Sequence, residues 1–223
     1  MAIGASGYNA LNMAEAYTVF SNGGVRVAPR FIRSIEARGG DTLESVTPER
    51  TNVLDPRVAY IVTDMLESVL NEGTAAAVGA RFNSPAAGKT GSSHDAWFAG
   101  YTSNLLCIVW VGNDDYTDIK MEGAHAAAPI WTEFMLRARK LRRYSEMKPF
   151  TPPAGVLPVA IDKASNLPAD GTCPDDYQVY FSDGTIPAAT CDHPEGPSRN
   201  IFQKIFGIGA HRELVMKTVT QPN

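Results

Sequence analysis

Residues 86–101 constrain the fold of this chain more than any other stretch. Their sequence is Ala-Ala-Gly-Lys-Thr-Gly-Ser-Ser-His-Asp-Ala-Trp-Phe-Ala-Gly-Tyr, so a lysine and a threonine between glycines lead directly into an aromatic, strand-like segment. The Lys89 ammonium attracts a carboxylate, and the neighbouring Thr90 hydroxyl can bind it. Gly91 has no Cβ, so another backbone or a flat ligand can approach the strand closely there. The stretch therefore predicts a strand edge that binds an acidic substrate end.

The main competing interpretation of this motif is a phosphate-binding loop. Gly88-Lys89-Thr90 matches the tail of the pattern G-x-x-x-x-G-K-[ST]. The first glycine of that pattern would fall at position 83, which is Asn83. A helix should also follow Thr90, whereas the residues there are aromatic and typical of a strand. We therefore favour the carboxylate site, although Lys-Thr-Gly alone is a common tripeptide and its meaning depends on its context.

That context consists of several motifs in a fixed order along most of the chain. They are Ala10-Leu11-Asn12-Met13-Ala14-Glu15-Ala16-Tyr17, Phe20-Ser21-Asn22-Gly23-Gly24-Val25, Gly88-Lys89-Thr90-Gly91, Trp97-Phe98-Ala99-Gly100-Tyr101, Val109-Trp110-Val111-Gly112-Asn113-Asp114-Asp115 and Ala128-Pro129-Ile130-Trp131. Together they resemble the back half of the transpeptidase domain of class A, or bifunctional, penicillin-binding proteins. Tyr180-Phe181 with Gly184-Thr185 is similar to the same family's C-terminal extension.

The resemblance implies an α/β (α+β) fold in which an antiparallel sheet is covered by helices, as in penicillin-binding proteins and serine β-lactamases, incomplete at its N-terminal side. It implies a D,D-transpeptidase, which acylates a serine with the penultimate D-Ala of a peptidoglycan stem peptide and transfers the acyl group to an amine. The implied partners are peptidoglycan stem peptides and β-lactam antibiotics, which acylate the same serine. The implied location is the periplasm or the extracytoplasmic face of the bacterial inner membrane.

The resemblance also assigns site residues. Lys89 and Thr90 would bind the substrate carboxylate, with Gly91, Ser92 and Ser93 completing the binding strand. Lys89 and the Ser92 backbone N–H would act in catalysis, the latter as half of an oxyanion hole. We expect no metal or cofactor in this site.

Three further residues of the stretch receive lesser roles. Asp95 and Trp97 are expected to shape the wall of the site. His94 has no sequence partner that would make it an acid or a base, and we interpret it as a solvated loop residue. The segment Ser92-Ser93-His94 is shorter than the family's usual loop, which commonly carries threonines.

The family's other two motifs, Ser-x-x-Lys and Ser-x-Asn, precede the helix that carries Leu-Asn-Met-Ala-Glu. We therefore expect the nucleophile outside this sequence, with the missing N-terminal half of the protein as a partner. The alternative is a non-catalytic interaction or structural fragment. Ser145-Glu146-Met147-Lys148 and Ser198-Arg199-Asn200 match the two motifs in spelling. We interpret both as surface coincidences, because a catalytic Ser-x-x-Lys needs its lysine held beside the serine in a buried place.

Charge and hydropathy exclude other classes. The net charge of −4 and pI near 5.6 give no basic surface for nucleic acid. The longest apolar run, Leu105–Val111, is too short to span a membrane, and the first residues lack the layout of a signal peptide. A length of 223 residues allows one domain and a tail. We place the transpeptidase portion at residues 1–147 and a Pro/Gly-rich tail or small module at 148–223.

The three cysteines have different surroundings. Cys107 lies in an apolar run and is expected to be a buried thiol. Cys173 and Cys191 flank a Gly/Pro/Asp-rich segment and could form a disulfide in an oxidising compartment. The alternative is a metal site built from Cys173, Cys191-Asp192-His193 and His211, although the tight paired spacing of zinc ligands is absent.

Cap residues and helical spacing predict three helices. Asn12 with Glu15 indicates a capping box, and that helix should stop at Gly23-Gly24. Asp55 and Pro56 are typical of an N-cap and a first-turn proline. Pro129 is expected to open the last helix. The inward stripes predicted for these last two helices are Val58, Ile61/Val62, Met65 and Val69, and Ile130, Phe134, Ala138 and Leu141.

Two pairs of strands are also predicted. Residues 31–37 and 42–46 favour a hairpin across Gly39-Gly40-Asp41. Residues 90–101 and 105–111 favour two longer strands. Because the second of these is apolar on both faces, we expect it to be central in its sheet and covered by helices.

Overall fold

The computed structural model describes residues 8–191 of this chain. The predicted coincidence at Ser198-Arg199-Asn200 and the candidate ligands Asp192, His193 and His211 lie outside the described residues. The described part divides into two compact units, one formed by residues 8–158 with 180–185 and the other by 159–179 with 186–191.

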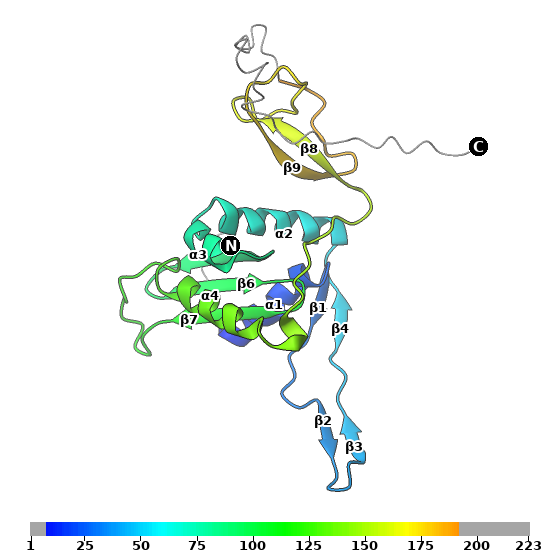
Figure 1. Cartoon of the computed structure of the whole chain (residues 1–223), viewed down its shortest axis with the longest axis vertical. Coiled ribbons are helices and arrows are strands. Elements are labelled where there is room, and N and C mark those ends of the chain that lie inside the picture. The colour runs from blue at the N-terminus through cyan, green and yellow to red at the C-terminus, as the bar shows by residue number, and fades with distance from the viewer. Residues whose placement is uncertain (1–7, 192–223) are drawn as a thin grey trace, which may run out of the picture. The chain divides into compact units, whose positions relative to one another are not determined.

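A three-stranded antiparallel sheet forms the centre of the first unit (Figure 1). It contains β5 (Ala87–Ser92), β6 (Ala96–Tyr101) and β7 (Leu106–Val111), with β6 in the middle. Two predictions were wrong here. Residues 90–101 are not one strand, because the chain turns at 93–95, and β7 rather than β6 lies at an edge of this sheet. β7 is covered by α1 and α4, as its apolar sequence on both faces indicates. Such a sequence does not determine where a strand lies in its sheet.

Four helices accompany the sheet: α1 (Ala10–Ser21), α2 (Pro56–Asn71), α3 (Ala76–Phe82) and α4 (Ala127–Ala138). The cap of α1 is Asn9, whose side chain accepts a hydrogen bond from the Asn12 N–H, so the predicted Asn12 cap was three residues too late. The helix ends before Gly23 and Gly24, which both have positive φ. Asp55 caps α2 as predicted.

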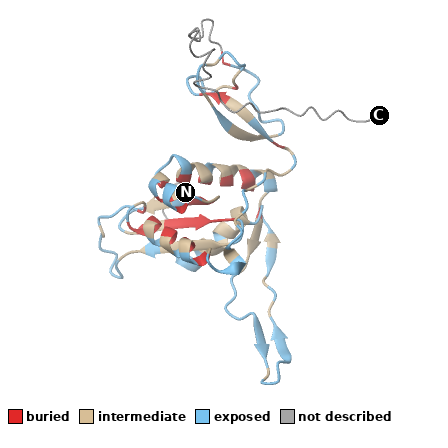
Figure 2. Cartoon of the chain, viewed as in Figure 1, coloured by how far each residue is buried: buried red, intermediate tan, exposed pale blue. Residues whose placement is uncertain are grey.

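The buried residues gather on β6 and on the inner sides of the helices (Figure 2). On one face of the sheet, Trp131 of α4 packs against Phe98 and Phe82, with ring centroids 5.1 and 5.3 Å apart. On the other face, the Tyr101 hydroxyl lies 2.8 Å from the Thr63 hydroxyl of α2. β6 therefore has buried residues on both of its faces, and β5 pairs with it along its whole length.

The predicted helix stripes were wrong in part, since Ala138 is buried and Val62 and Val69 pack against the core as predicted. In α2 the buried residues are Ala59, Tyr60, Thr63, Leu66 and Leu70, while Val58 and Met65 are exposed. In α4 the buried set includes Trp131, Thr132, Met135 and Ala138, whereas Ile130, Phe134 and Leu141 are exposed. Both helices carry apolar residues on more than one side, and the side that faces the core combines large apolar residues with alanine and threonine.

The remaining elements of the first unit are short. β1 (Val25–Val27) pairs with β4 (Arg50–Asn52), and β2 (Ser34–Glu36) pairs with β3 (Thr42–Ser45). The β2–β3 pair is the hairpin predicted across Gly39-Gly40-Asp41, and Gly40 has a φ of 89°. A single 3-10 turn, Arg142–Tyr144, follows α4.

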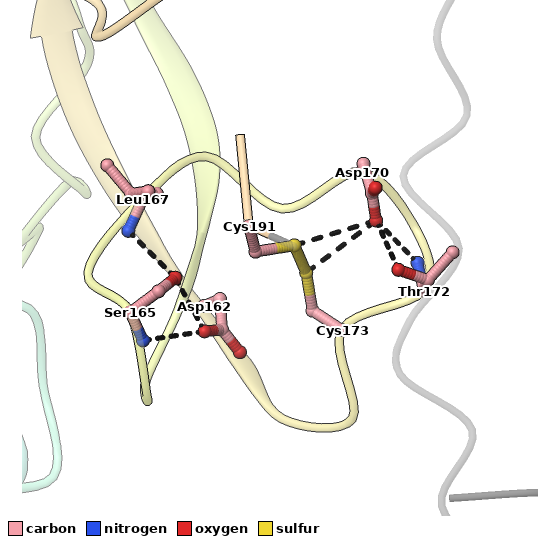
Figure 3. Close-up of a disulfide and its surroundings, with 7 residues drawn as sticks. All are labelled: Asp162, Ser165, Leu167, Asp170, Thr172, Cys173 and Cys191. Atoms are coloured by element: carbon pink, nitrogen blue, oxygen red, sulfur yellow. Dashed lines mark hydrogen bonds between the residues drawn. A yellow bond between two sulfur atoms is a disulfide. The ribbon is translucent and has the colours of Figure 1, made fainter. Parts of the chain in front are cut away.

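The C-terminal region forms a two-stranded sheet of β8 (Val156–Asp162) and β9 (Asp176–Ser182). Cys173 and Cys191 form a disulfide, as predicted (Figure 3). Because their thiolates are consumed in this bond, the zinc alternative was wrong for these two residues. Asp170 Oδ1 lies beside the two sulfurs, 3.5 Å from Cys191 Sγ and 3.8 Å from Cys173 Sγ.

Cys107 is a free thiol in β7, half-buried rather than buried. Burial raises its pKa to about 11, so the thiol form predominates at neutral pH. None of the helices within residues 8–191 is long and apolar enough to cross a membrane.

Candidate functional site

The Lys-Thr-Gly segment lies in β5, an edge strand of the sheet that the described residues form. Side chains alternate along a strand, so Lys89 and Gly91 share one face while Thr90 and Ser92 share the other. An edge strand offers a row of backbone N–H and C=O groups to another extended chain. The segment is therefore placed where a peptide could add as a further strand.

Lys89 is an exposed cation in β5. Its Nζ donates a hydrogen bond to the Thr90 carbonyl oxygen at 2.7 Å. Among the described residues it takes part in no ion pair. Its charge remains available to a carboxylate from outside the chain.

Thr90 faces a cavity of about 320 Å³. Its Oγ1 lies 3.0 Å from the Thr74 hydroxyl, which comes from the loop between α2 and α3. The cavity joins three parts of the chain, and its lining is Thr74, Ala75, Ala77, Val78, Thr90, Ser92, Glu122, Ala124 and His125. Hydroxyl groups thus line the cavity on the strand side and ionisable groups on the opposite side.

Gly123 is a site residue that the sequence analysis missed. Its N–H donates to Ser92 Oγ at 2.9 Å. A Cβ at position 123 would lie 2.5 Å from both the Gly91 and the Trp97 carbonyl oxygens, so only glycine fits. The backbone of Gly123 thus lies close to the backbone of Gly91 within the chain itself. In the sequence, the glycine of Met-Glu-Gly-Ala-His was the only sign of this contact.

Asp95 lies in the turn between β5 and β6 and accepts three side-chain hydrogen bonds. Its Oδ1 accepts a hydrogen bond from Ser93 Oγ at 2.8 Å. Its Oδ2 accepts from Trp97 Nε1 at 3.0 Å and from Trp110 Nε1 at 2.7 Å. Burial raises the pKa of Asp95, but these hydrogen bonds outweigh it and the net shift is downward. The carboxylate is thus ionised at neutral pH and ties the turn to β6 and β7.

Trp110 belongs to one of the family motifs, but the sequence did not predict its contact with Asp95. Its position in Val109-Trp110-Val111 is opposite Trp97 in the strand register. The sequence alone does not determine which residue of β7 pairs with Trp97 of β6. The Ser93 hydroxyl donates to Asp95, and the substrate-binding role expected of Ser93 stays a prediction.

His94 is exposed, and its ring lies 4.9 Å from the Tyr116 ring. Its carbonyl oxygen accepts a hydrogen bond from the Ile119 N–H at 3.0 Å, which fixes the loop before α4 to the turn. Ser145, from the chance Ser-x-x-Lys match, is also exposed and donates to the Arg142 carbonyl oxygen at 3.1 Å. Lys148 is likewise exposed, so this pair lacks the buried surroundings of an activated serine.

Comparisons with known proteins bear on the family and the fold. A family model described as "Penicillin binding protein transpeptidase domain" matches residues 1–136. Penicillin-binding protein 1A of Clostridium tetani is 36% identical over 209 residues, which cover 88% of this chain and 26% of that protein. Penicillin-binding protein 1A of Aquifex aeolicus is 33% identical over 196 residues, covering 86% of this chain and 26% of that protein.

A solved structure shows the same fold. The crystal structure of Penicillin-Binding Protein 1A from Haemophilus influenzae has a TM-score of 0.73 at 24% identity, over 82% of this chain and 33% of that chain. The chain spans about a quarter of the length of the curated relatives that it matches. The motif order, the mixed helix and antiparallel-sheet fold and the matched family model all agree. The chain belongs to the penicillin-binding protein transpeptidase domain family.

Proposed function

We propose that this chain supplies the carboxylate-binding strand of a peptidoglycan D,D-transpeptidase, which cross-links stem peptides in cell-wall synthesis. Lys89 and Thr90 bind the terminal carboxylate of a stem peptide or of a β-lactam. The observation that carries the proposal is the exposed Lys89 ammonium beside the Thr90 hydroxyl on an edge strand. A cation and a hydroxyl in adjacent positions suit a carboxylate that arrives along the strand.

The Thr74 hydroxyl supports this role for Thr90. A hydroxyl has one hydrogen to donate and two lone pairs that accept. When Thr74 donates to Thr90 across their 3.0 Å separation, the Thr90 hydrogen is free to point at a ligand oxygen. Thr74 would thus orient the Thr90 hydroxyl before substrate arrives.

The Ser92 backbone N–H is proposed as one oxyanion-hole donor. The Gly123 N–H holds the Ser92 side chain, and the Asp95 cluster holds the turn that follows. A donor fixed in this way stabilises a developing negative charge without rearranging during the reaction. The serine that is acylated comes from the Ser-x-x-Lys segment that the resemblance places ahead of α1, and the site operates on the extracytoplasmic side of the membrane.

The test compares acylation rates in a protein that carries this chain together with the Ser-x-x-Lys segment. Thr90→Val should lower the second-order rate of penicillin acylation about ten- to a hundredfold, because a hydrogen bond to a charged group contributes about 1.5–3 kcal/mol. Lys89→Ala should lower it further, since it removes the positive field. Ser93→Ala is the comparison variant and should lower the rate far less, because its hydroxyl holds the turn through Asp95 and Ser93 does not line the cavity.

Equal acylation rates for Thr90→Val and Ser93→Ala would overturn the proposed role of the strand. A second measurement addresses the nucleophile. The 223-residue chain alone, incubated with a fluorescent penicillin, should show no added mass, because Ser92, Ser93 and Ser145 are all exposed and lack the buried surroundings of an activated serine. A stable adduct on Ser92, Ser93 or Ser145 would contradict this.

A further inference from the structure

The cavity beside Thr90 is larger than the proposed carboxylate contact requires. β5 lines it with Thr90 and Ser92, and residues from the segment 122–125 line another side. Its volume of about 320 Å³ exceeds what a carboxylate fills, so a further group of the ligand has room there. The start of α3 gives the cavity an apolar side, formed by Ala75, Ala77 and Val78.

The segment 122–125 is held in place from two directions. The Gly123 N–H donates to Ser92 Oγ of β5 at 2.9 Å. The Gly123 carbonyl oxygen accepts from the N–H groups of Ala127 and Ala128, at 3.1 and 2.9 Å, which begin α4. The side chains on either side of Gly123 therefore leave a fixed backbone at the edge of the cavity.

Two of these side chains are ionisable. Among the described residues that line the cavity, Glu122 is the only acid, His125 is the only histidine, and none is a lysine or an arginine. Glu122 Oε2 lies 3.9 Å from His125 Nδ1, which is longer than a hydrogen bond. With 74% and 77% of the two side chains exposed, this pair is weak, and the carboxylate can interact with a ligand.

Lys89 does not line this cavity. Its side chain lies on the other face of β5, because neighbouring side chains alternate along a strand. The Lys89 ammonium thus attracts the ligand carboxylate to the strand edge, while the charge on the cavity wall itself comes from the segment that carries Glu122. The two charges act on different parts of one ligand.

The chemistry of a bound peptide indicates which part reaches the cavity. A terminal carboxylate is bonded directly to the Cα of its residue, so the side chain of that residue starts close to the carboxylate. With the carboxylate on Thr90, this side chain begins at the cavity that Thr90 lines. An aliphatic stem suits the alanines and Val78 of α3. A charged end then meets Glu122, which attracts an ammonium and repels a second carboxylate.

We propose that this cavity binds the side chain of the residue that carries the terminal carboxylate, and that Glu122 selects neutral and cationic side chains over anionic ones. The inference rests on the proposed function, in which Lys89 and Thr90 bind that carboxylate. Glu122 determines specificity, because repulsion of the wrong ligand discriminates as well as attraction of the right one. The substrate class is a peptide whose terminal residue has a small or basic side chain.

Three dipeptides that share one carboxylate test the proposal: acetyl-D-Ala-D-Ala, acetyl-D-Ala-D-Lys and acetyl-D-Ala-D-Glu. Each is measured as an inhibitor of penicillin acylation in a protein that carries this chain together with the Ser-x-x-Lys segment. The D-Lys dipeptide should inhibit at about two- to fivefold lower concentration than the D-Glu dipeptide, as expected for exposed charges. This ratio should shrink in 1 M salt, because ions screen the attraction and the repulsion.

Variants assign the selection to the cavity. Glu122→Gln should bring the ratio to about one, and Glu122→Lys should reverse the order of the two dipeptides. Asp114→Asn is the matched control, because Asp114 is also an exposed acid but does not line the cavity, so the ratio should stay unchanged. Ala77→Leu narrows the cavity at an exposed position of α3 and should weaken the D-Lys dipeptide more than the D-Ala dipeptide.

Equal inhibition by the D-Lys and D-Glu dipeptides would overturn the proposal, and so would an unchanged ratio in Glu122→Gln. Thr90→Val distinguishes this failure from that of the proposed function. It should weaken all three dipeptides alike, because they share the carboxylate. If it does so while the ratio in the unmodified protein is one, the carboxylate site stands and only the selection by Glu122 fails. If Thr90→Val weakens none of them, the proposed function fails and this inference with it.

Discussion

The β5–β6–β7 sheet and the β8–β9 sheet are stabilised by different means. In the first, the central strand β6 is mostly buried, with Phe98 and Tyr101 fully covered on opposite faces. In the second region the fully covered residues are few, and the turn depends on a disulfide and on Asp162, whose Oδ2 accepts from the Ser165 N–H and Oγ at 2.7 Å each. β5, which carries Lys89, pairs with the buried strand β6. The C-terminal region is held by covalent and polar links.

The strongest test of this difference is a substitution in the sheet's core. Trp131→Ala should lower the free energy of unfolding by about 3–5 kcal/mol, because it leaves a cavity between Phe82 and Phe98 and removes the donor to Gly100. Urea denaturation followed by circular dichroism measures it. Phe134→Ala on the same helix is the control, since that ring is 48% exposed and its loss should cost less than about 1 kcal/mol. Similar losses for both would mean that the sheet is not stabilised by its packing.

The second test removes the covalent link of the other region. Cys173→Ser with Cys191→Ser opens a connection between residues 18 apart, which should cost about 3 kcal/mol by the chain-entropy estimate. Hydrogen exchange should accelerate at amides of β8 and β9 but not at those of β6. Faster exchange in both sheets would show that the two regions are not independently stabilised.

Thiol alkylation checks the same assignment. Only Cys107 should react, and slowly, before denaturation, because burial raises its pKa to about 11 and the thiolate is scarce. Cys173 and Cys191 should become reactive only after reduction. Rapid alkylation of Cys107 in the native protein would contradict its half-buried place in β7.

The two regions also differ in how far the sequence predicted them. Asp55-Pro56 and Gly39-Gly40-Asp41 determine local structure through caps and turns, and both predictions were correct. The cysteine pair was predicted from its surroundings. In contrast, the order of strands and the turn at 93–95 depend on contacts between distant residues, which periodicity does not record.

The candidate site shows the same division. Lys89 and Thr90 could be named from local chemistry because the motif and its flanking glycines are contiguous. Gly123 contacts Ser92 from 31 residues along the chain, and Trp110 contacts Asp95 from 15 residues along it. Backbone packing places the first and strand register places the second. The helix stripes failed in part for a related reason, since α2 and α4 each carry apolar residues on more than one side and only the packed structure shows which side faces the core.

The next prediction concerns the pH dependence of stability in the first unit, which contains Glu67. Burial, together with the nearby charge of Asp64, raises the pKa of Glu67 in α2 to about 7. The folded state therefore binds this proton more tightly than the unfolded state does. The stabilisation is present below the ordinary pKa of 4.5 and is lost as the pH rises through 7.

Glu67→Gln should remove this dependence and stabilise the protein above pH 7 by roughly 1 kcal/mol, a value reduced for the partial exposure of the carboxyl. Urea midpoints between pH 4.5 and 8 measure it. Glu133→Gln is the control, because the pKa of Glu133 is shifted in the opposite direction. Hydrogen bonding from Arg137 lowers the pKa of Glu133, so its contribution is present at neutral pH and is lost as the pH falls through the lowered value. A Glu67→Gln variant with the unmodified pH profile would contradict the half-buried environment of this residue.

The smallest effect is expected from a surface ion pair in the C-terminal region. Lys163 Nζ lies 3.1 Å from Asp175 Oδ1, with 55% and 60% of the two side chains exposed. Such a pair contributes about 0–1 kcal/mol, because water screens the attraction and both side chains lose freedom. In a double-mutant cycle of Lys163→Ala and Asp175→Ala, the coupling measured by hydrogen exchange of β8 and β9 should fall in this range and shrink in 1 M salt. A coupling as large as the effect of the disulfide would mean that charge, and not the covalent link, holds this region, and the contrast with the packed sheet would need a different explanation. We expect the disulfide to dominate, because it restricts the unfolded chain whatever the ionic strength, whereas an exposed pair acts only while both side chains stay in place.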